Sequence, residues 1–198
     1  MVRQRGRWGF LNKAGQLPIP CQFELVWPFS DGLARIRQGN GYQFIDRRGQ
    51  VVIEGPFTYT LNFSEGLAAV EQAGKFGFID SQGQFAIPPL YDEVGLFSEG
   101  LASVRQQGRV GFIDKQGKLV IPLRYDPMLM SVLHPFSEGL AIIKKGGKCG
   151  FINVVGEEII PPTFDEAGNF SEGLALIKKK REMGICEYHR ASCYFLFV

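Results

Sequence analysis

The chain has 198 residues, 45% of them hydrophobic and 21% charged, with a formal net charge of +2. This composition is typical of a folded domain with a sizeable core. So small a charge gives no reason to expect nucleic acid or an anionic membrane as a partner. No apolar run is long enough for a membrane span, and Arg3, Arg5 and Arg7 lead directly into Trp8 without an apolar signal segment.

One short string recurs along the chain at a nearly constant spacing. Phe-Ser-Glu-Gly-Leu-Ala, or a near copy, starts at Phe29, Phe63, Phe97, Phe136 and Phe170, in steps of 34, 34, 39 and 34 residues. A fixed period of this length marks a tandem-repeat architecture, in which each unit needs its neighbours to cover its apolar face. Function is therefore to be sought in what differs between repeats, or in the surface that they form together.

Residues 63–96 show what one repeat is expected to form. Strand-forming residues predict strands over 67–71, 76–80 and 84–87, joined by glycine-containing turns. Pro88 and Pro89 are expected to end the third strand, because proline donates no hydrogen bond to a neighbouring strand. Residues 90–95 then cross to the next repeat, and no segment shows helical periodicity.

The predicted fold is therefore all-β, with tandem meander or hairpin repeats of 34 residues stacked in an open array. About five repeats fill residues 1–181 as a single array, with a partial repeat at each end. A β-propeller is the alternative, because a chain that starts and ends within a repeat permits a closing blade. The repeated register predicts that Phe97, Leu101, Phe112 and Ile113 are buried.

Two acidic columns recur in the repeats, and both are interpreted as structural. Paired carboxylates could serve glycoside hydrolysis, but an active site needs unlike environments, and a repeated column offers similar ones. The Asp/Asn column is expected to cap turns, and the Glu column to pair with Arg7, Lys75, Arg109 and Lys148. The columns are Asn12, Asp46, Asp80, Asp114 and Asn153, and Asp31, Glu65, Glu99, Glu138 and Glu172.

No enzymatic activity, metal site or cofactor is expected from the remaining motifs. The sequence has no phosphate-binding loop, nucleophile elbow or repeated calcium-binding pattern. Cys21, Cys149, Cys186 and Cys193 share no column and form no close pair, which argues against a disulfide framework or a zinc site. Reduced thiols and a cytoplasmic location are therefore expected.

The repeat signature resembles the WG-repeat family of bacterial β-rich repeats. Trp8-Gly9-Phe10 follows Arg7 and precedes Asn12, Gly15 and the Phe-Ser-Glu-Gly-Leu-Ala string. The resemblance implies a β-repeat array with a binding or scaffolding role, and no reaction, cofactor or catalytic residue. Tryptophan stands only at Trp8 in its column, which elsewhere holds Tyr42, Phe76, Val110, Cys149 and Met183.

The repeat pattern is broken at two places. Five residues are inserted within 126–135, an apolar segment that contains Met128, Leu129, Met130, Leu133 and His134. Insertions in repeats map to loops on one face, so this one either contacts a partner or folds back over its own connector. His134 is interpreted as a structural imidazole. Residues 182–198 lack the expected turn glycine, so they form either a divergent capping strand or a frameshifted tail.

Two function classes remain open. The preferred one is a non-catalytic scaffold that binds an unknown protein through its extended repeat surface. The alternative is a carbohydrate or cell-wall binding module, in which exposed aromatic residues such as Trp8, Trp27, Tyr42 and Tyr59 stack on sugar rings. The candidate binding residues are the five in the insertion together with Trp27 and Tyr59.

Overall fold

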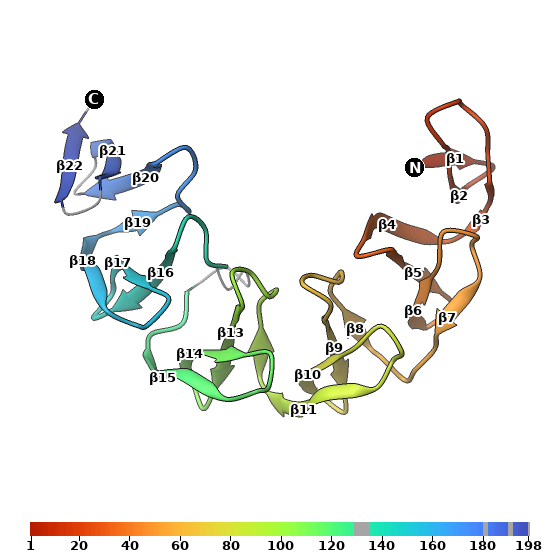
Figure 1. The fold of residues 1–198 in the computed structure, drawn as a ribbon, viewed down its shortest axis with the longest axis horizontal. Coiled ribbons are helices and arrows are strands. Elements are labelled where there is room, and N and C mark those ends of the chain that lie inside the picture. Colours follow the sequence, from red (N-terminus) through yellow and green to blue (C-terminus); the bar gives the residue numbers. More distant parts are fainter. Residues whose placement is uncertain (129–134, 180–181, 190–191, 198) are drawn as a thin grey trace. The chain divides into compact units, whose positions relative to one another are not determined.

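The computed structural model describes residues 1–128, 135–179, 182–189 and 192–197, which form strands and turns without a helix (Figure 1). The chain divides into two compact units, Met1–Tyr91 and Asp92–Val198, and each is described by itself. Both contain small, open, antiparallel sheets that follow the sequence repeats. The predicted all-β tandem-repeat fold is confirmed.

The first unit contains three sheets. Its first sheet has the order β1-β2-β3, with β1 (Val2–Gln4), β2 (Arg7–Phe10) and β3 (Ile19–Phe23). The second has the order β4-β5-β6-β7, with β4 (Leu25–Ser30), β5 (Leu33–Gln38), β6 (Gly41–Ile45) and β7 (Val51–Ile53). The third runs from β8 (Tyr59–Thr60) through β9 (Ala68–Gln72) and β10 (Lys75–Ile79) to β11 (Phe85–Tyr91).

The second unit repeats this arrangement. One sheet contains β12 (Glu93–Val94), β13 (Leu101–Gln106), β14 (Arg109–Asp114) and β15 (Leu119–Tyr125). The next contains β16 (Leu140–Lys145), β17 (Lys148–Asn153) and β18 (Glu158–Phe164). The last contains β19 (Glu166–Ala167), β20 (Leu174–Lys179), β21 (Glu182–His189) and β22 (Ser192–Phe197).

The third strand of a repeat passes through its prolines, so the prediction that they end it is wrong. Strand β11 extends to Tyr91, and a bulge sets Pro88, Pro89 and Leu90 opposite Gly77 on β10. Prolines fit here because β11 is an edge strand and bulged residues need no ladder hydrogen bond. The connector also supplies a short fourth strand, such as β8, that the sequence did not predict.

The bulge explains the glycine of the Trp-Gly motif. A Cβ atom added to Gly77, Gly111 or Gly150 would lie 2.5 Å from the carbonyl oxygen of Ile87, Ile121 or Ile160. No side chain fits at that distance without moving the third strand. The motif glycine is thus required by the close approach of the proline-containing strand.

The hydrophobic core consists of layers between successive sheets. The phenylalanine after the motif glycine packs edge-to-face on the first phenylalanine of the following Phe-Ser-Glu-Gly turn. The ring centroids of Phe44 and Phe63 are 4.9 Å apart, and those of Phe151 and Phe170 are 4.8 Å apart. As predicted, Phe97, Leu101, Phe112 and Ile113 are buried, with 1%, 7%, 2% and 0% of their surface exposed.

The Phe-Ser-Glu-Gly turn is hydrogen-bonded to the corresponding turn of the next repeat in the same unit. The Glu138 carboxylate accepts the Gly173 N–H at 2.9 Å, and the Ser137 hydroxyl donates to the Phe170 carbonyl oxygen at 2.8 Å. Glu99 and Ser98 make the same contacts with the turn at Gly139, at 2.9 and 2.8 Å. Because Glu and Gly both adopt positive φ, 55° at Glu138 and 79° at Gly139, the turn is tight and projects the carboxylate forward.

The predicted partners of the Glu column are therefore wrong in part. Arg7, Arg109 and Lys148 pair with acids that follow the third strand, namely Glu24, Asp126 and Asp165. These acids lie closer because the third strand ends beside the start of the second. Within this column, Asp31, Glu99 and Glu138 accept backbone N–H groups instead.

The Asp/Asn column caps turns, as predicted. Asp80 Oδ1 accepts the N–H groups of Gln82 and Gln84, each at 2.9 Å, and Asn153 Oδ1 accepts those of Val155 and Glu157. Asn replaces Asp here because the same side-chain oxygen accepts both bonds. The acidic columns therefore have structural contacts.

We expect Phe112→Ala to lower the free energy of unfolding by about 3–5 kcal/mol, because it removes a buried ring from the layer shared with Phe136. Urea unfolding monitored by circular dichroism measures the change. Leu119→Ala is the control, since Leu119 is 43% exposed. A loss below about 1 kcal/mol for Phe112→Ala would contradict this account of the core.

Glu138→Ala should destabilise the second unit by about 1 kcal/mol, because the Gly173 N–H loses its acceptor. Alanine adopts the positive φ no more easily than glutamate, so the change reports the lost hydrogen bond. Glu138→Gln is the matched control, because its amide oxygen still accepts. Equal unfolding midpoints for Glu138→Ala and the unmodified protein would show that the contact contributes nothing.

Candidate functional site

Three residues of the first unit depart from their repeat columns. Trp27 stands where other repeats have Leu61, Gly95 and Gly168. Arg35 stands where they have Ala69, Ser103, Ile142 and Leu176, and Tyr59 where they have Leu25, Glu93 and Glu166. The repeat fold therefore does not require these three side chains.

The structure brings these side chains together with Tyr42 around the guanidinium of Arg35. Arg35 Cζ lies 3.8 Å from the ring centroid of Trp27, 5.7 Å from that of Tyr42 and 5.9 Å from that of Tyr59. Arg35 projects from β5, Trp27 from β4, Tyr42 from β6 and Tyr59 from β8 of the next sheet. We call these four residues the aromatic–arginine cluster.

The rings of the cluster form a chain of contacts across the two sheets. Trp27 and Tyr42 have centroids 5.8 Å apart, Tyr42 and Tyr59 are 5.9 Å apart, and Tyr59 and Phe76 are 6.2 Å apart. The interplanar angles are 43°, 63° and 75°, so neighbouring rings are tilted or edge-to-face. Such contacts stabilise the rings in defined orientations.

Arg35 is a buried cation held mainly by the faces of these rings. Only 7% of its surface is exposed, and its Nη1 donates to the carbonyl oxygen of Thr60. Burial lowers the pKa of Arg35, whereas Tyr59 and Tyr42 oppose this shift. Arg35 Nε and Thr60 Oγ1 are buried without a hydrogen-bond partner. Cation–π attraction offsets part of the cost of removing the guanidinium from water.

The outer side of the cluster is open to solvent. Tyr59 is 41% exposed, and Trp27 and Tyr42 are partly exposed. A fixed cation thus lies beneath aromatic rings that a binding partner can reach. Trp8, the other tryptophan, lies on β2 with Arg3 Cζ 5.7 Å from its ring.

The same repeat has a second irregularity on the opposite face of its sheet. Gln43 replaces the motif glycine, and β7 ends at Ile53, whereas β11 of the next repeat continues to Tyr91. A side chain at position 43 excludes the close approach that the proline bulge makes elsewhere. A hollow of about 280 Å³ remains there, lined by Gln22, Phe23, Ile36, Gln38, Gln43, Gly49 and Val51.

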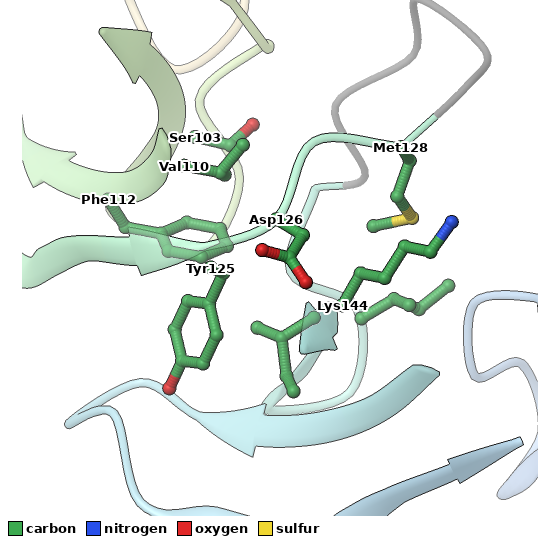
Figure 2. A pocket seen from close by; sticks show the side chains of 9 residues that line it. Ser103, Val110, Phe112, Tyr125, Asp126, Met128 and Lys144 are labelled. Atoms are coloured by element: carbon green, nitrogen blue, oxygen red, sulfur yellow. The ribbon is translucent and has the colours of Figure 1, made fainter. Parts of the chain in front are cut away.

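Met128 is the one candidate of the insertion among the described residues. It is half-buried and packs against the core layer between the sheets of β17 and β20. Figure 2 shows its side chain near Asp126 and Lys144, beside a cavity of about 10 Å³, which is room for about one water molecule. The buried Ser103 hydroxyl, which also lines this cavity, has no hydrogen-bond partner. Leu129, Met130, Leu133 and His134 lie outside the described residues.

Other kinds of site find little support in the described part of the chain. It contains no group of three or more His, Cys, Asp or Glu side chains placed to hold a metal ion. Among the described residues, Cys21, Cys149 and Cys186 form no disulfide, and burial raises the pKa of Cys149. Among the described residues, no helix could cross a membrane.

The sequence predicted Trp27 and Tyr59 as binding residues, and Tyr42 as an aromatic residue that stacks on sugar in the alternative function. The structure brings all three side chains together. The sequence prediction missed Arg35. The signal was present, because Arg35 is the only charged residue in its column. Only the structure shows that this column lies in the layer between sheets.

The comparisons with known proteins identify the family. A model described as WG containing repeat matches residues 8–42, 44–76, 76–109, 111–149 and 150–181, so the chain belongs to the WG-repeat family. No protein with a curated description matches the sequence.

Several solved structures match this chain at low sequence identity. "KlHsv2 with loop 6CD replaced by a Gly-Ser linker" matches with a TM-score of 0.57 and 10% identity, over 98% of this chain and 78% of that one. Kluyvelomyces marxianus Hsv2 matches with a TM-score of 0.49 and 9% identity, over 88% and 71%. BamB from Moraxella catarrhalis matches with a TM-score of 0.46 and 11% identity, over 88% and 60%. At 10% identity, the first of these matches is a likeness of fold alone.

Arg35→Ala should loosen the cluster while the repeat fold is retained, because alanine occupies this column at Ala69. In a Trp8→Phe background, Trp27 is the only tryptophan. Acrylamide should quench its fluorescence more strongly in Arg35→Ala, because Arg35 no longer covers the ring. Arg37→Ala is the control, since Arg37 is exposed on the same strand. Unchanged quenching in Arg35→Ala would show that Arg35 does not hold Trp27.

Proposed function

We propose that this WG-repeat protein is a non-catalytic scaffold that binds another protein, and that the aromatic–arginine cluster of residues 1–91 is the centre of its contact surface. The observation that carries the proposal is that Trp27, Arg35 and Tyr59 each depart from the repeat pattern and yet meet in one cluster. Since folding of a repeat does not need these side chains, binding is the simplest reason for their presence.

The chemistry of the cluster supports a protein partner. Trp, Tyr and Arg are the residues that most often dominate binding energy at protein interfaces. The rings are held by one another and by Arg35, so little side-chain freedom is lost on binding. An exposed Tyr59 beside partly exposed Trp27 and Tyr42 provides an apolar anchor with polar edges.

The geometry of the rings favours protein over carbohydrate. A sugar stacks on an open, flat aromatic face, whereas Arg35 covers one face of Trp27 and the rings meet at steep angles. A catalytic role is not proposed, because carboxylates of both acidic columns accept backbone N–H bonds. The cytoplasmic location stays a prediction.

Replacing the cluster by residues from other repeats tests this function. A variant with Trp27→Leu, Arg35→Ala and Tyr59→Glu should unfold at a similar temperature to the unmodified protein. It should bind its partner at least about tenfold more weakly. Its matched control carries Leu17→Ala, Val51→Ala and Val52→Ala, which remove exposed apolar side chains elsewhere in the unit.

Affinity capture with quantitative mass spectrometry, followed by binding measurements on the purified partner, compares the variants. Equal affinity of the cluster variant and the unmodified protein would reject the cluster as the contact surface. Glycan-array binding that is lost only in the cluster variant would favour the carbohydrate alternative.

A further inference from the structure

The cation of the aromatic–arginine cluster has no acidic partner within the described part of the chain. Arg35 is 7% exposed, and no carboxylate of a described residue forms an ion pair with it. By contrast, the more exposed Arg7, Arg105 and Arg109 each form an ion pair with an acidic side chain. A buried cation without a counter-charge costs free energy, which the ring faces offset only in part.

The repeat pattern shows that an acidic column is interrupted beside this guanidinium. The column of Tyr59 holds Glu93 and Glu166 in two repeats of the second unit. There the carboxylates pair with Arg105 and Lys178, at 2.6 and 2.7 Å. In the first unit this column supplies the ring of Tyr59, whose centroid lies 5.9 Å from the guanidinium carbon. The counter-charge that this column offers elsewhere is therefore replaced by an aromatic ring.

One edge of the Arg35 guanidinium has unused hydrogen-bond donors. Nη1 donates to the carbonyl oxygen of Thr60, but Nε is buried without a hydrogen-bond partner. Nη2 makes no hydrogen bond to a described residue. Nε and Nη2 lie along the same edge of the planar fork, and their spacing matches the two oxygens of a carboxylate. This edge can therefore bind a carboxylate through two parallel hydrogen bonds.

We propose that the protein partner inserts an aspartate or glutamate side chain into the aromatic–arginine cluster, where its carboxylate binds the Nε and Nη2 edge of Arg35. Apolar residues beside that acid pack on the rings of Trp27, Tyr42 and Tyr59. Because Nε is buried in the free protein, the ring of Tyr59, which is 41% exposed, must turn aside to admit the carboxylate. This inference rests on the proposed function and names the chemistry that the partner presents.

Charge complementarity favours a carboxylate over a phosphate group. The cluster contains a single cation, Arg35, which one carboxylate neutralises, whereas a phosphate group carries up to two charges and is bound by clusters of arginines. The surrounding rings exclude water, and the attraction between the two charges is stronger in such a setting than in solvent. The acid thus determines which partner segment binds, and the rings add apolar contact.

Selection of peptides on the protein tests this chemistry. A library of random short peptides displayed on phage is selected on the unmodified protein and on Arg35→Met, whose side chain is unbranched and uncharged. Peptides enriched only on the unmodified protein should contain Asp or Glu next to an apolar residue. Replacing that acid by its amide should weaken binding to the unmodified protein at least about tenfold. The same replacement should change binding to Arg35→Met by less than about twofold, because the acid then has no cation to pair with.

Two substitutions at the exposed Tyr59 give a second test that leaves Arg35 in place. Tyr59→Gln and Tyr59→Glu both remove the ring, but only Tyr59→Glu supplies an internal carboxylate that competes for the guanidinium. Tyr59→Gln should keep the preference for acidic peptides over their amide forms, and Tyr59→Glu should lose it. Arg37→Ala is the control for general charge effects, since Arg37 is exposed on the same strand, and it should bind like the unmodified protein.

Circular dichroism checks that each variant is folded. Failure to select any peptide, enrichment without acidic residues, an equal effect of the amide replacement on Arg35→Met, or an acid preference retained by Tyr59→Glu would each overturn the proposal. Enriched peptides without acids that no longer bind the triple cluster variant would overturn it while supporting the cluster as a contact surface. Equal affinity of the triple cluster variant and the unmodified protein for the captured partner would reject both proposals.

Discussion

The close packing of one sheet on the next within each unit is the interaction on which the rest of the structure depends. A sheet of three or four short strands cannot bury enough apolar surface alone, so each repeat is stable only against its neighbour. The Phe44–Phe63 and Phe151–Phe170 pairs fill this layer, and the Glu–Gly contact at the turns fixes its register. The repeat motif is thus a set of interface residues rather than a catalytic signature.

This constraint separates structural from functional residues. Gly77 is required by the proline bulge, Asp80 by a turn, and Glu138 by the Gly173 N–H. Arg35 satisfies no such requirement, and alanine fills the same column in the next repeat. A buried guanidinium beside three aromatic rings carries a desolvation cost that the folding of the repeat does not explain.

The proposed contact surface departs from the repeat architecture at three positions. The aromatic–arginine cluster replaces repeat residues with others and creates a local contact site in residues 1–91. Specific recognition of another protein suits a surface of this kind.

The sequence by itself determined the repeat length, the all-β class and the buried register, because strand periodicity and a fixed spacing follow directly from the order of residues. It also indicated Trp27 and Tyr59, as aromatic residues that could be exposed for binding. The tertiary structure alone decided that β11 continues through Pro88 and Pro89, because a bulge depends on the neighbouring strand. It alone placed Arg35 against Trp27, Tyr42 and Tyr59, because contacts between sheets depend on packing that no local pattern encodes.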